Sequence, residues 1–170
     1  VENERNANNH SQEMEDVSEL IHENNIKETN IMNIIRDIGN QTKILIFSAH
    51  NASQKLVRWL KEKGIQNTEL KGNKYVIDNI ISNFKHGNVR VLFLNPNSFG
   101  AGLNLENTTD IIMMHKMSME MENQIIGRAQ RYGRTSNLRV WHMRHPNEEQ
   151  YINPELRMRR HMESLRRNNA

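Results

Sequence analysis

Short apolar segments alternate with amphipathic segments through most of this 170-residue sequence. The apolar segments have the length and continuity of strands that are buried on both faces of a sheet. The amphipathic segments repeat apolar residues at intervals of three and four, as helices do. This alternation predicts an α/β fold, with a parallel sheet and helices on both of its faces. The expected strands lie at 43–47, 67–70, 89–94, 110–114 and 138–143.

The expected helices lie at 53–63, 75–84 and 119–129, and an earlier one ends near Ile38. Asn30 is expected to cap that earlier helix and Gly39 to stop it. Ligands of parallel α/β sheets bind beyond the carboxyl ends of the strands. The segments in those positions are polar or small, which predicts a binding edge: SAHN after Phe47, NPNSFGAG after Leu94 and HKMS after Met114.

The two ends of the chain differ in composition from its middle. Residues 1–15 are polar and show no periodicity, so we expect a disordered leader before a folded domain at 16–150. Residues 151–170 are rich in arginine, and Asn153 and Pro154 are typical of a helix start. The arginines of this expected C-terminal helix are compatible with a solvated face and also with nucleic-acid contact.

Composition excludes several kinds of site. The sequence has no cysteine, which excludes disulfides and thiolate metal ligands. His115, His142 and His145 have no carboxylate at metal-ligand spacing, so no metal site is expected. The net charge of +3 argues only weakly for an anionic partner. No apolar run is long enough to span a membrane and no signal-peptide pattern is present, so we expect an intracellular protein that is not secreted.

One segment, QIIGRAQRYGR from Gln124 to Arg134, places three arginines and two glycines within eleven residues. Arg128, Arg131 and Arg134 follow one another at intervals of three, and like charges this close repel each other unless an anion lies nearby. Three kinds of anion fit: a carboxylate cluster, a nucleic-acid backbone or a nucleotide triphosphate. The segment predicts an anion-binding site without deciding between them.

The same segment matches the sixth motif of superfamily 2 helicases and translocases, Q-x-x-G-R-x-x-R-x-G-R/Q, at every defined position. SFGAGLNLENTTDIIMMH resembles motif V with the strand that follows it, and KILIFSAH resembles motif IV. Residues 30–150 resemble the second RecA-like domain of this superfamily, the helicase C-terminal domain. The pattern is most similar to the Swi/Snf-type DNA-dependent ATPases and their large-DNA-virus relatives. The resemblance implies a three-layer RecA-like fold of the P-loop NTPase type.

The resemblance implies a nucleotide site in which two RecA-like domains clamp one ATP with Mg²⁺. Arg131 would be the arginine finger and Arg128 its companion on the triphosphate, because a planar guanidinium stabilises charge that develops on the γ-phosphate. The other implied ATP-binding residues shape the turn that aims these arginines or lie near the ribose and the domain interface: Gln124, Gly127, Gly102 and Asn104.

The resemblance also implies a nucleic-acid track, with DNA favoured over RNA. The residues implied for it are Ser48, His50, Lys71, Gly72, Asn97 and Ser98. Lys71 and Gly72 are equally compatible with a plain turn. Pro96 stands where the family usually has a Thr or Ser that binds a phosphate, so Asn95, Asn97 or Ser98 would have to replace that contact.

Two features of the family are absent from the sequence. The Trp-bearing loop typical of chromatin remodellers is replaced by Lys116–Met119, which does not support a nucleosome-remodelling role. No G-x-x-x-x-G-K-[ST] motif occurs, and no Asp-Glu pair follows an apolar strand. The phosphate cradle and the magnesium ligands are expected on an N-terminal RecA-like domain of the same parent chain.

The sequence thus predicts the second motor domain of an ATP-dependent superfamily 2 helicase or translocase. We expect no tightly bound cofactor on this domain and no hydrolysis by this domain alone. The alternative is a non-catalytic, stand-alone RecA-like domain that binds nucleic acid or a protein partner. The abundance of Asn, Ile and Lys is compatible with an AT-rich viral genome, in which case the protein would work in the nucleus or cytoplasm of the host.

Overall fold

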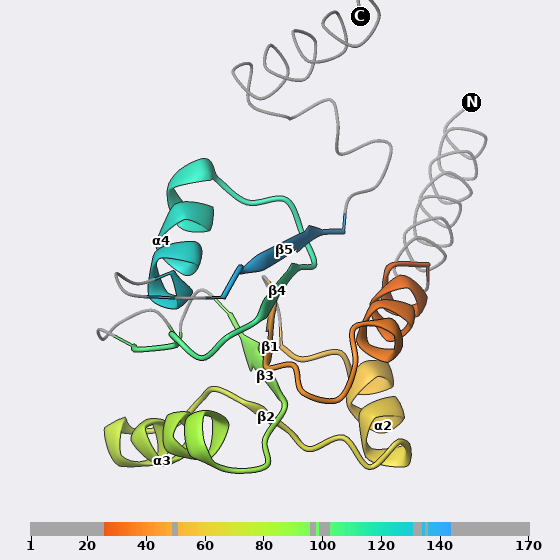
Figure 1. Cartoon of the computed structure of the whole chain (residues 1–170), viewed down its shortest axis with the longest axis horizontal. Coiled ribbons are helices and arrows are strands. Elements are labelled where there is room, and N and C mark those ends of the chain that lie inside the picture. The colour runs from red at the N-terminus through yellow and green to blue at the C-terminus, as the bar shows by residue number, and fades with distance from the viewer. Residues whose placement is uncertain are drawn as a thin grey trace, which may run out of the picture.

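Five strands and four helices form the part of the chain that the computed structural model describes, namely residues 26–48, 51–95, 98, 103–130, 134 and 136–143 (Figure 1). A helix over residues 26–37 comes first. The other elements follow in the order β1 (Ile44–Phe47), α2 (Gln54–Glu62), β2 (Asn67–Glu69), α3 (Lys74–His86), β3 (Val91–Leu94), β4 (Asp110–Met113), α4 (Met119–Ala129) and β5 (Arg139–His142). All five predicted strands, and the three helices predicted after the first, are confirmed. The expected leader and the expected Arg-rich helix lie outside the described residues.

The strands form one sheet in the order β2-β3-β1-β4-β5. β1 lies in the middle, with Ile44 opposite Val91 of β3 on one side and opposite Asp110 of β4 on the other. β2 and β5 form the edges, and all four pairings are parallel. The three central strands are buried along their full length, as the continuous apolar runs predict. The predicted parallel sheet is confirmed.

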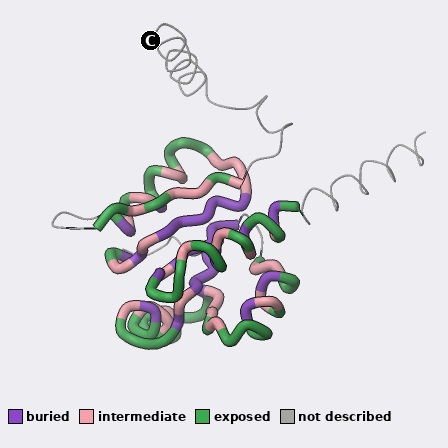
Figure 2. Tube along the Cα trace, turned by 45° about the vertical axis from the view of Figure 1, so that its right-hand side comes forward, coloured by how far each residue is buried: buried purple, intermediate pink, exposed green. Residues whose placement is uncertain are grey.

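Alternate side chains of the central strands divide the core into two clusters, one on each face of the sheet. Leu45 and Phe47 of β1 belong to the cluster that α3 and α4 cover. Ile44 and Ile46 belong to the cluster that helix 26–37 and α2 cover. Figure 2 shows the buried strands enclosed between helices whose outer faces are exposed. The predicted three-layer arrangement is confirmed.

Helix 26–37 differs from the prediction at its beginning. It passes through Asn30, which is exposed, so the prediction that Asn30 caps this helix is wrong. Lys27 and Ile31 are both buried one turn apart, and Lys27 Nζ donates to the carbonyl oxygen of Met114 at 3.0 Å. Within the described residues, the buried face of this helix therefore includes a lysine, which a search for apolar residues overlooks. Gly39 follows the helix with a φ of 88° and ends it as predicted.

Side-chain caps fix where the other helices begin. Ser53, Asn73 and Ser118 precede α2, α3 and α4, and each accepts a hydrogen bond from the amide of the third residue beyond it. Each cap satisfies one backbone donor that a helix leaves unpaired at its start. These caps set the direction in which each helix leaves the carboxyl edge of the sheet.

Candidate nucleotide and nucleic-acid site

Three loops predicted to bind nucleic acid are neighbours at the carboxyl edge of the sheet. They follow β1, β3 and β2, which are adjacent strands. The amide of Ser48, after β1, donates to the carbonyl oxygen of Leu94 at the end of β3 (3.0 Å). The hydroxyl of Ser98, after β3, donates to the carbonyl oxygen of Leu70, after β2 (2.9 Å). The fold therefore brings the three loops together, as the sequence predicts.

The two serines predicted for the track face the protein interior. Ser48 is 4% exposed and Ser98 is 9% exposed. The Ser98 hydroxyl already bonds Leu70, so it links two loops of this edge. His50 and Asn97, which are predicted for the same track, lie outside the described residues.

The segment after β2 supplies the exposed part of this edge. Lys71 is exposed, and its Nζ lies 3.2 Å from a carboxylate oxygen of Glu69. Gly72 has a φ of 125°, and a Cβ at this position would lie 2.9 Å from Cγ1 of Val76. The turn itself therefore requires glycine, whether or not nucleic acid approaches it.

Three residues predicted to bind the nucleotide lie on one face of α4. Gln124, Gly127 and Arg128 are spaced i, i+3 and i+4, so they are neighbours on the helix surface. Ile125 and Ala129 are buried against the sheet instead. Gln124 and Gly127 are exposed, and Arg128 is partly buried. Within the described ranges, no hydrogen bond or ion pair engages the Arg128 guanidinium.

Among the described residues, no neighbour of Gly127 requires a glycine at this position. It lies inside α4 and lacks a positive φ. A Cβ built there meets no atom within 4 Å among the described residues. An interior glycine costs a helix about 1 kcal/mol relative to alanine, so this glycine lowers the stability of the domain without helping its packing.

The end of α4 is tied to the segment before β4. The amide of Leu105 donates to the carbonyl oxygen of Arg128 at 3.1 Å. Asn104, the preceding residue, is thereby held close to Arg128, as the prediction of one shared site requires. The Asn104 side chain also forms a local turn, because its Oδ1 accepts from the Glu106 amide at 3.2 Å. Gly102 and Arg131 lie outside the described residues.

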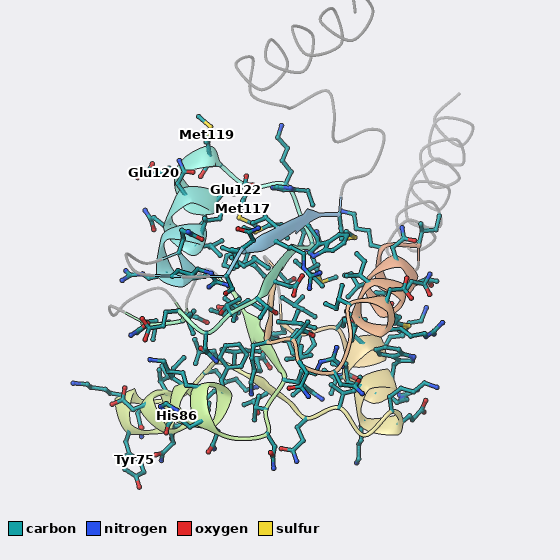
Figure 3. The ribbon with its side chains drawn as sticks, in the orientation of Figure 1. Tyr75, His86, Met117, Met119, Glu120 and Glu122 are labelled. Atoms are coloured by element: carbon teal, nitrogen blue, oxygen red, sulfur yellow. The ribbon has the colours of Figure 1, made fainter. Side chains whose placement is uncertain are left out.

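Polar contacts fix α4 and β5 to the sheet. Glu122 of α4 pairs with His142 of β5. Figure 3 shows Glu122 on the side of α4 that faces β5, with Glu120 on the outer side. Asp110, at the start of β4, is fully buried and accepts from Arg139 Nε at 2.7 Å and from Trp141 Nε1 at 3.0 Å. Both ends of β5 are therefore anchored by side chains.

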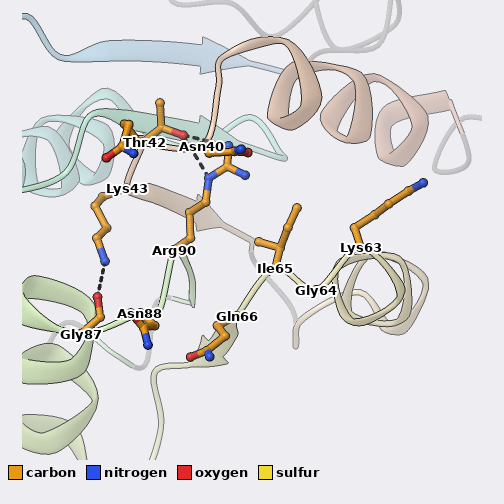
Figure 4. Close-up of a pocket in the computed structure, with 11 residues that line it drawn as sticks. Asn40, Thr42, Lys43, Lys63, Gly64, Ile65, Gln66, Gly87, Asn88 and Arg90 are labelled. Atoms are coloured by element: carbon orange, nitrogen blue, oxygen red, sulfur yellow. Dashed lines mark hydrogen bonds between the residues drawn. The ribbon is translucent and has the colours of Figure 1, made fainter.

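An open polar cavity of about 520 Å³ lies at the other edge of the sheet, near the amino ends of the strands (Figure 4). Arg90 lies in its wall and donates to the carbonyl oxygen of Ile35 at 3.0 Å and to Thr42 Oγ1 at 2.9 Å. Lys43 Nζ donates to the carbonyl oxygens of Gly87 (3.0 Å) and Val89 (2.6 Å). These cations hold loops together at this edge.

Burial lowers the pKa of both cations. Desolvation lowers the pKa of Arg90, which Asp110 partly offsets. Desolvation also lowers the pKa of Lys43. Figure 4 shows the Lys63 side chain directed away from Arg90, so the cationic groups do not converge on one point. We therefore place the candidate functional site at the carboxyl edge and at α4.

Comparison with known proteins identifies the family to which the chain belongs. Residues 26–133 match the helicase conserved C-terminal domain family. The chain belongs to this family. It is 39% identical over 119 residues to "Putative helicase R592" of Acanthamoeba polyphaga mimivirus, a match that covers 69% of the chain and 14% of that relative. The chain thus spans a small part of the length of this helicase relative.

Solved helicase-family structures share the fold of this C-terminal domain. The C-terminal part of the Fun30 ATPase domain gives a TM-score of 0.59 at 18% identity, over 68% of this chain and 40% of that one. The C-terminal domain of the DEAD-box protein Dbp5 gives 0.58 at 16% identity, over 73% of each chain. The Sulfolobus solfataricus SWI2/SNF2 ATPase core in complex with double-stranded DNA gives 0.54 at 27% identity, over 68% and 25%. The predicted RecA-like domain of superfamily 2 is confirmed.

The donor chemistry of this helicase C-terminal domain suits an anion better than a metal ion. The face formed by Gln124, Gly127 and Arg128 offers a guanidinium, an amide and open space. The described part of the chain contains no group of three or more His, Cys, Asp or Glu side chains placed to hold a metal ion. It also contains no helix that is long and apolar enough to cross a membrane. The face of α4 thus presents donors of the kind that bind anions.

Proposed function

We propose that this domain is the second motor domain of an ATP-dependent superfamily 2 helicase or translocase. In this proposal the parent chain also carries an N-terminal RecA-like domain, which holds most of ATP and Mg²⁺. The observation that carries the proposal is the exposed face of α4, where Gln124, Gly127 and Arg128 lie side by side. Gly127 lowers helix stability there and has no packing role among the described residues. Its absence of a side chain is explained if a nucleotide or a second domain approaches this face closely.

Two arginines would act on the triphosphate. Arg128 has a guanidinium with no partner in the described ranges, and it would bind phosphate oxygens through its planar fork of donors. Arg131 follows it by three residues and would be the arginine finger. Bound ATP and Mg²⁺ would supply the transferable phosphoryl group and neutralise part of its charge. Because charge on that group grows in the transition state, the finger would act mainly on kcat.

The carboxyl edge would form part of the nucleic-acid track. Lys71 is exposed there, and Gly72 leaves the backbone of its turn accessible. The proposed track also includes Ser48, His50 and Asn97, because they belong to the loops that follow β1 and β3. Contacts of this kind would be made to phosphates, so binding would be independent of base sequence and sensitive to salt. Ser98 would act by holding the loop after β3 against Leu70.

Steady-state ATPase measurements on the full-length parent test the nucleotide proposal. Arg131→Ala should lower kcat by roughly 10³–10⁵-fold, the range that arginine fingers contribute elsewhere. Nucleic-acid binding and thermal melting should stay unchanged. Arg58→Ala is the matched control, because Arg58 is an exposed arginine of α2 on the opposite face of the sheet. Wild-type hydrolysis by a folded Arg131→Ala parent would contradict the proposed finger role, whereas a parent that hydrolyses no ATP at all would favour the non-catalytic binding domain.

A further inference from the structure

The third arginine of the QIIGRAQRYGR segment makes contacts quite unlike those of Arg128. Arg134 Nε donates to the carbonyl oxygen of Ser136 at 2.7 Å. Its Nη1 donates to the carbonyl oxygens of Glu106 (2.9 Å) and Ala129 (3.2 Å), and its Nη2 donates to the carbonyl oxygen of Thr108. All four acceptors are backbone carbonyls. The guanidinium is therefore engaged with the protein itself, on every one of its three nitrogens.

These carbonyls belong to separate parts of the chain. Ala129 is the last residue of α4, and its carbonyl is one that a helix leaves without an internal partner. Glu106 and Thr108 belong to the turn that precedes β4, which is also tied to α4 by the bond from the Leu105 amide to the Arg128 carbonyl. Arg134 thus joins the end of α4 to this turn, and the cation also suits the negative end of the helix dipole.

The segment that carries Arg131 is held at both of its ends. On one side Gln130 caps the end of α4, and its amide donates to the carbonyl oxygen of Ile126 at 2.7 Å. On the other side Arg134 is bound to the four carbonyls, and only residues 131–133 lie between them. The residues on either side of 131–133, Gln130 and Arg134, are thus both bound to the body of the domain.

We propose that Arg134 is a positioning residue for the finger arginine, and this inference rests on the proposed function. Arg134 acts by fixing the segment that carries Arg131 to the turn at residues 105–108. Lysine cannot replace it, because an ammonium has three donors on one atom and cannot reach acceptors spread around a planar fork. The contact should affect the rate of phosphoryl transfer more than the affinity for ATP, since the finger acts in the transition state.

ATPase kinetics of the full-length parent provide the first test. Arg134→Ala and Arg134→Lys should each lower kcat by about 10- to 100-fold, as expected when a catalytic group is misplaced by about 1 Å, with KM for ATP changed by about twofold or less. Arg90→Ala is the matched control, because Arg90 also donates to backbone carbonyls but at the opposite edge of the sheet. When the assays are run at a temperature at which thermal melting shows all three variants folded, Arg90→Ala should hydrolyse ATP near the wild-type rate.

A double-mutant cycle separates positioning from an independent contribution. If Arg134 acts through Arg131, the double variant Arg131→Ala/Arg134→Ala should be no more than about twofold slower than Arg131→Ala alone. If the fold-losses in kcat of the two single variants multiply in the double variant, the two arginines act independently. That result would overturn the inference and leave the finger assignment intact. A wild-type rate for Arg131→Ala would instead overturn the proposed function, so the two failures are distinguishable.

Hydrogen exchange of the 170-residue chain gives a readout that does not depend on activity. Arg134→Ala should increase amide exchange at residues 130–136 at least tenfold, because the fixed end of the segment is lost. Arg90→Ala should leave exchange in that segment unchanged. Equal exchange of residues 130–136 in the wild type and in Arg134→Ala would refute the positioning role. If Arg134→Ala does not fold, Arg134→Lys, which keeps the charge, replaces it in each comparison.

Discussion

Replacing Gly127 by alanine should stabilise the domain and impair the motor. Gly127 lies inside α4, and a Cβ there meets no atom within 4 Å among the described residues. The substitution should therefore contribute its full helix-propensity gain of about 1 kcal/mol. For domains of 60–250 residues, a gain of this size raises Tm by roughly 2–8 °C. Thermal and urea unfolding of the 170-residue chain measure the gain directly.

The same methyl group should lower the ATPase activity of the full-length parent. It would project from the face that also presents Gln124 and Arg128, where the proposed nucleotide and first domain approach. A displacement of about 1 Å at this face should reduce kcat/KM by roughly tenfold or more. Gly127→Ala would therefore raise the stability of the domain and lower the activity of the parent, a common trade-off at functional sites.

Asn79→Ala provides the matched control for the Gly127 substitution. Asn79 is exposed in the middle of α3, so alanine there should also raise stability, by roughly half a kcal/mol. It should leave ATPase activity unchanged, because α3 is not part of the proposed nucleotide face. Full activity in a stabilised Gly127→Ala parent would refute the claim that this glycine makes room for a partner. A loss of stability would refute the claim that the space beside it is open.

Three further substitutions test other contacts. Asp110→Ala should destabilise the 170-residue chain by about 3 kcal/mol in urea unfolding, because it leaves Arg139 and Trp141 without their buried acceptor; a change below about 1 kcal/mol would contradict this. Lys71→Ala should weaken nucleic-acid binding by the parent for all base sequences alike, and should reduce the salt dependence of log K by about one; an unchanged salt dependence would remove Lys71 from the track. Because burial lowers the pKa of Lys43 below 10.5, the unfolded chain holds more protons between the two values, and the free energy of unfolding should rise with pH across that window. Lys43→Gln should flatten this rise, and an equal slope in both proteins would contradict the reasoning.

The sequence predicted the strands and most helices because each depends on local pattern. Buried strands such as Ile44–Phe47 are continuous apolar runs, and helices such as α3 and α4 repeat apolar residues at intervals of three and four. The order of the strands in the sheet was not predicted, since pairing depends on contacts between distant segments. The start of helix 26–37 was misplaced because Lys27 occupies a buried position and satisfies its ammonium on Met114. That bond spans 87 positions in the chain, which no local pattern reports.

The roles of the three arginines show the same limit at the candidate site. Arg128, Arg131 and Arg134 are equally spaced, so their spacing does not separate their roles; only the resemblance to motif VI implies the finger for Arg131 and its companion for Arg128. The helix ends at Ala129, however, and Gln130 has an extended backbone with a ψ of 99°. Arg134 lies beyond that point and binds carbonyls of the turn before β4. Of the two arginines of this segment that the structure describes, Arg134 is occupied by four carbonyl acceptors of the protein, whereas Arg128 has no partner among the described residues, so the proposed anion contact falls to Arg128.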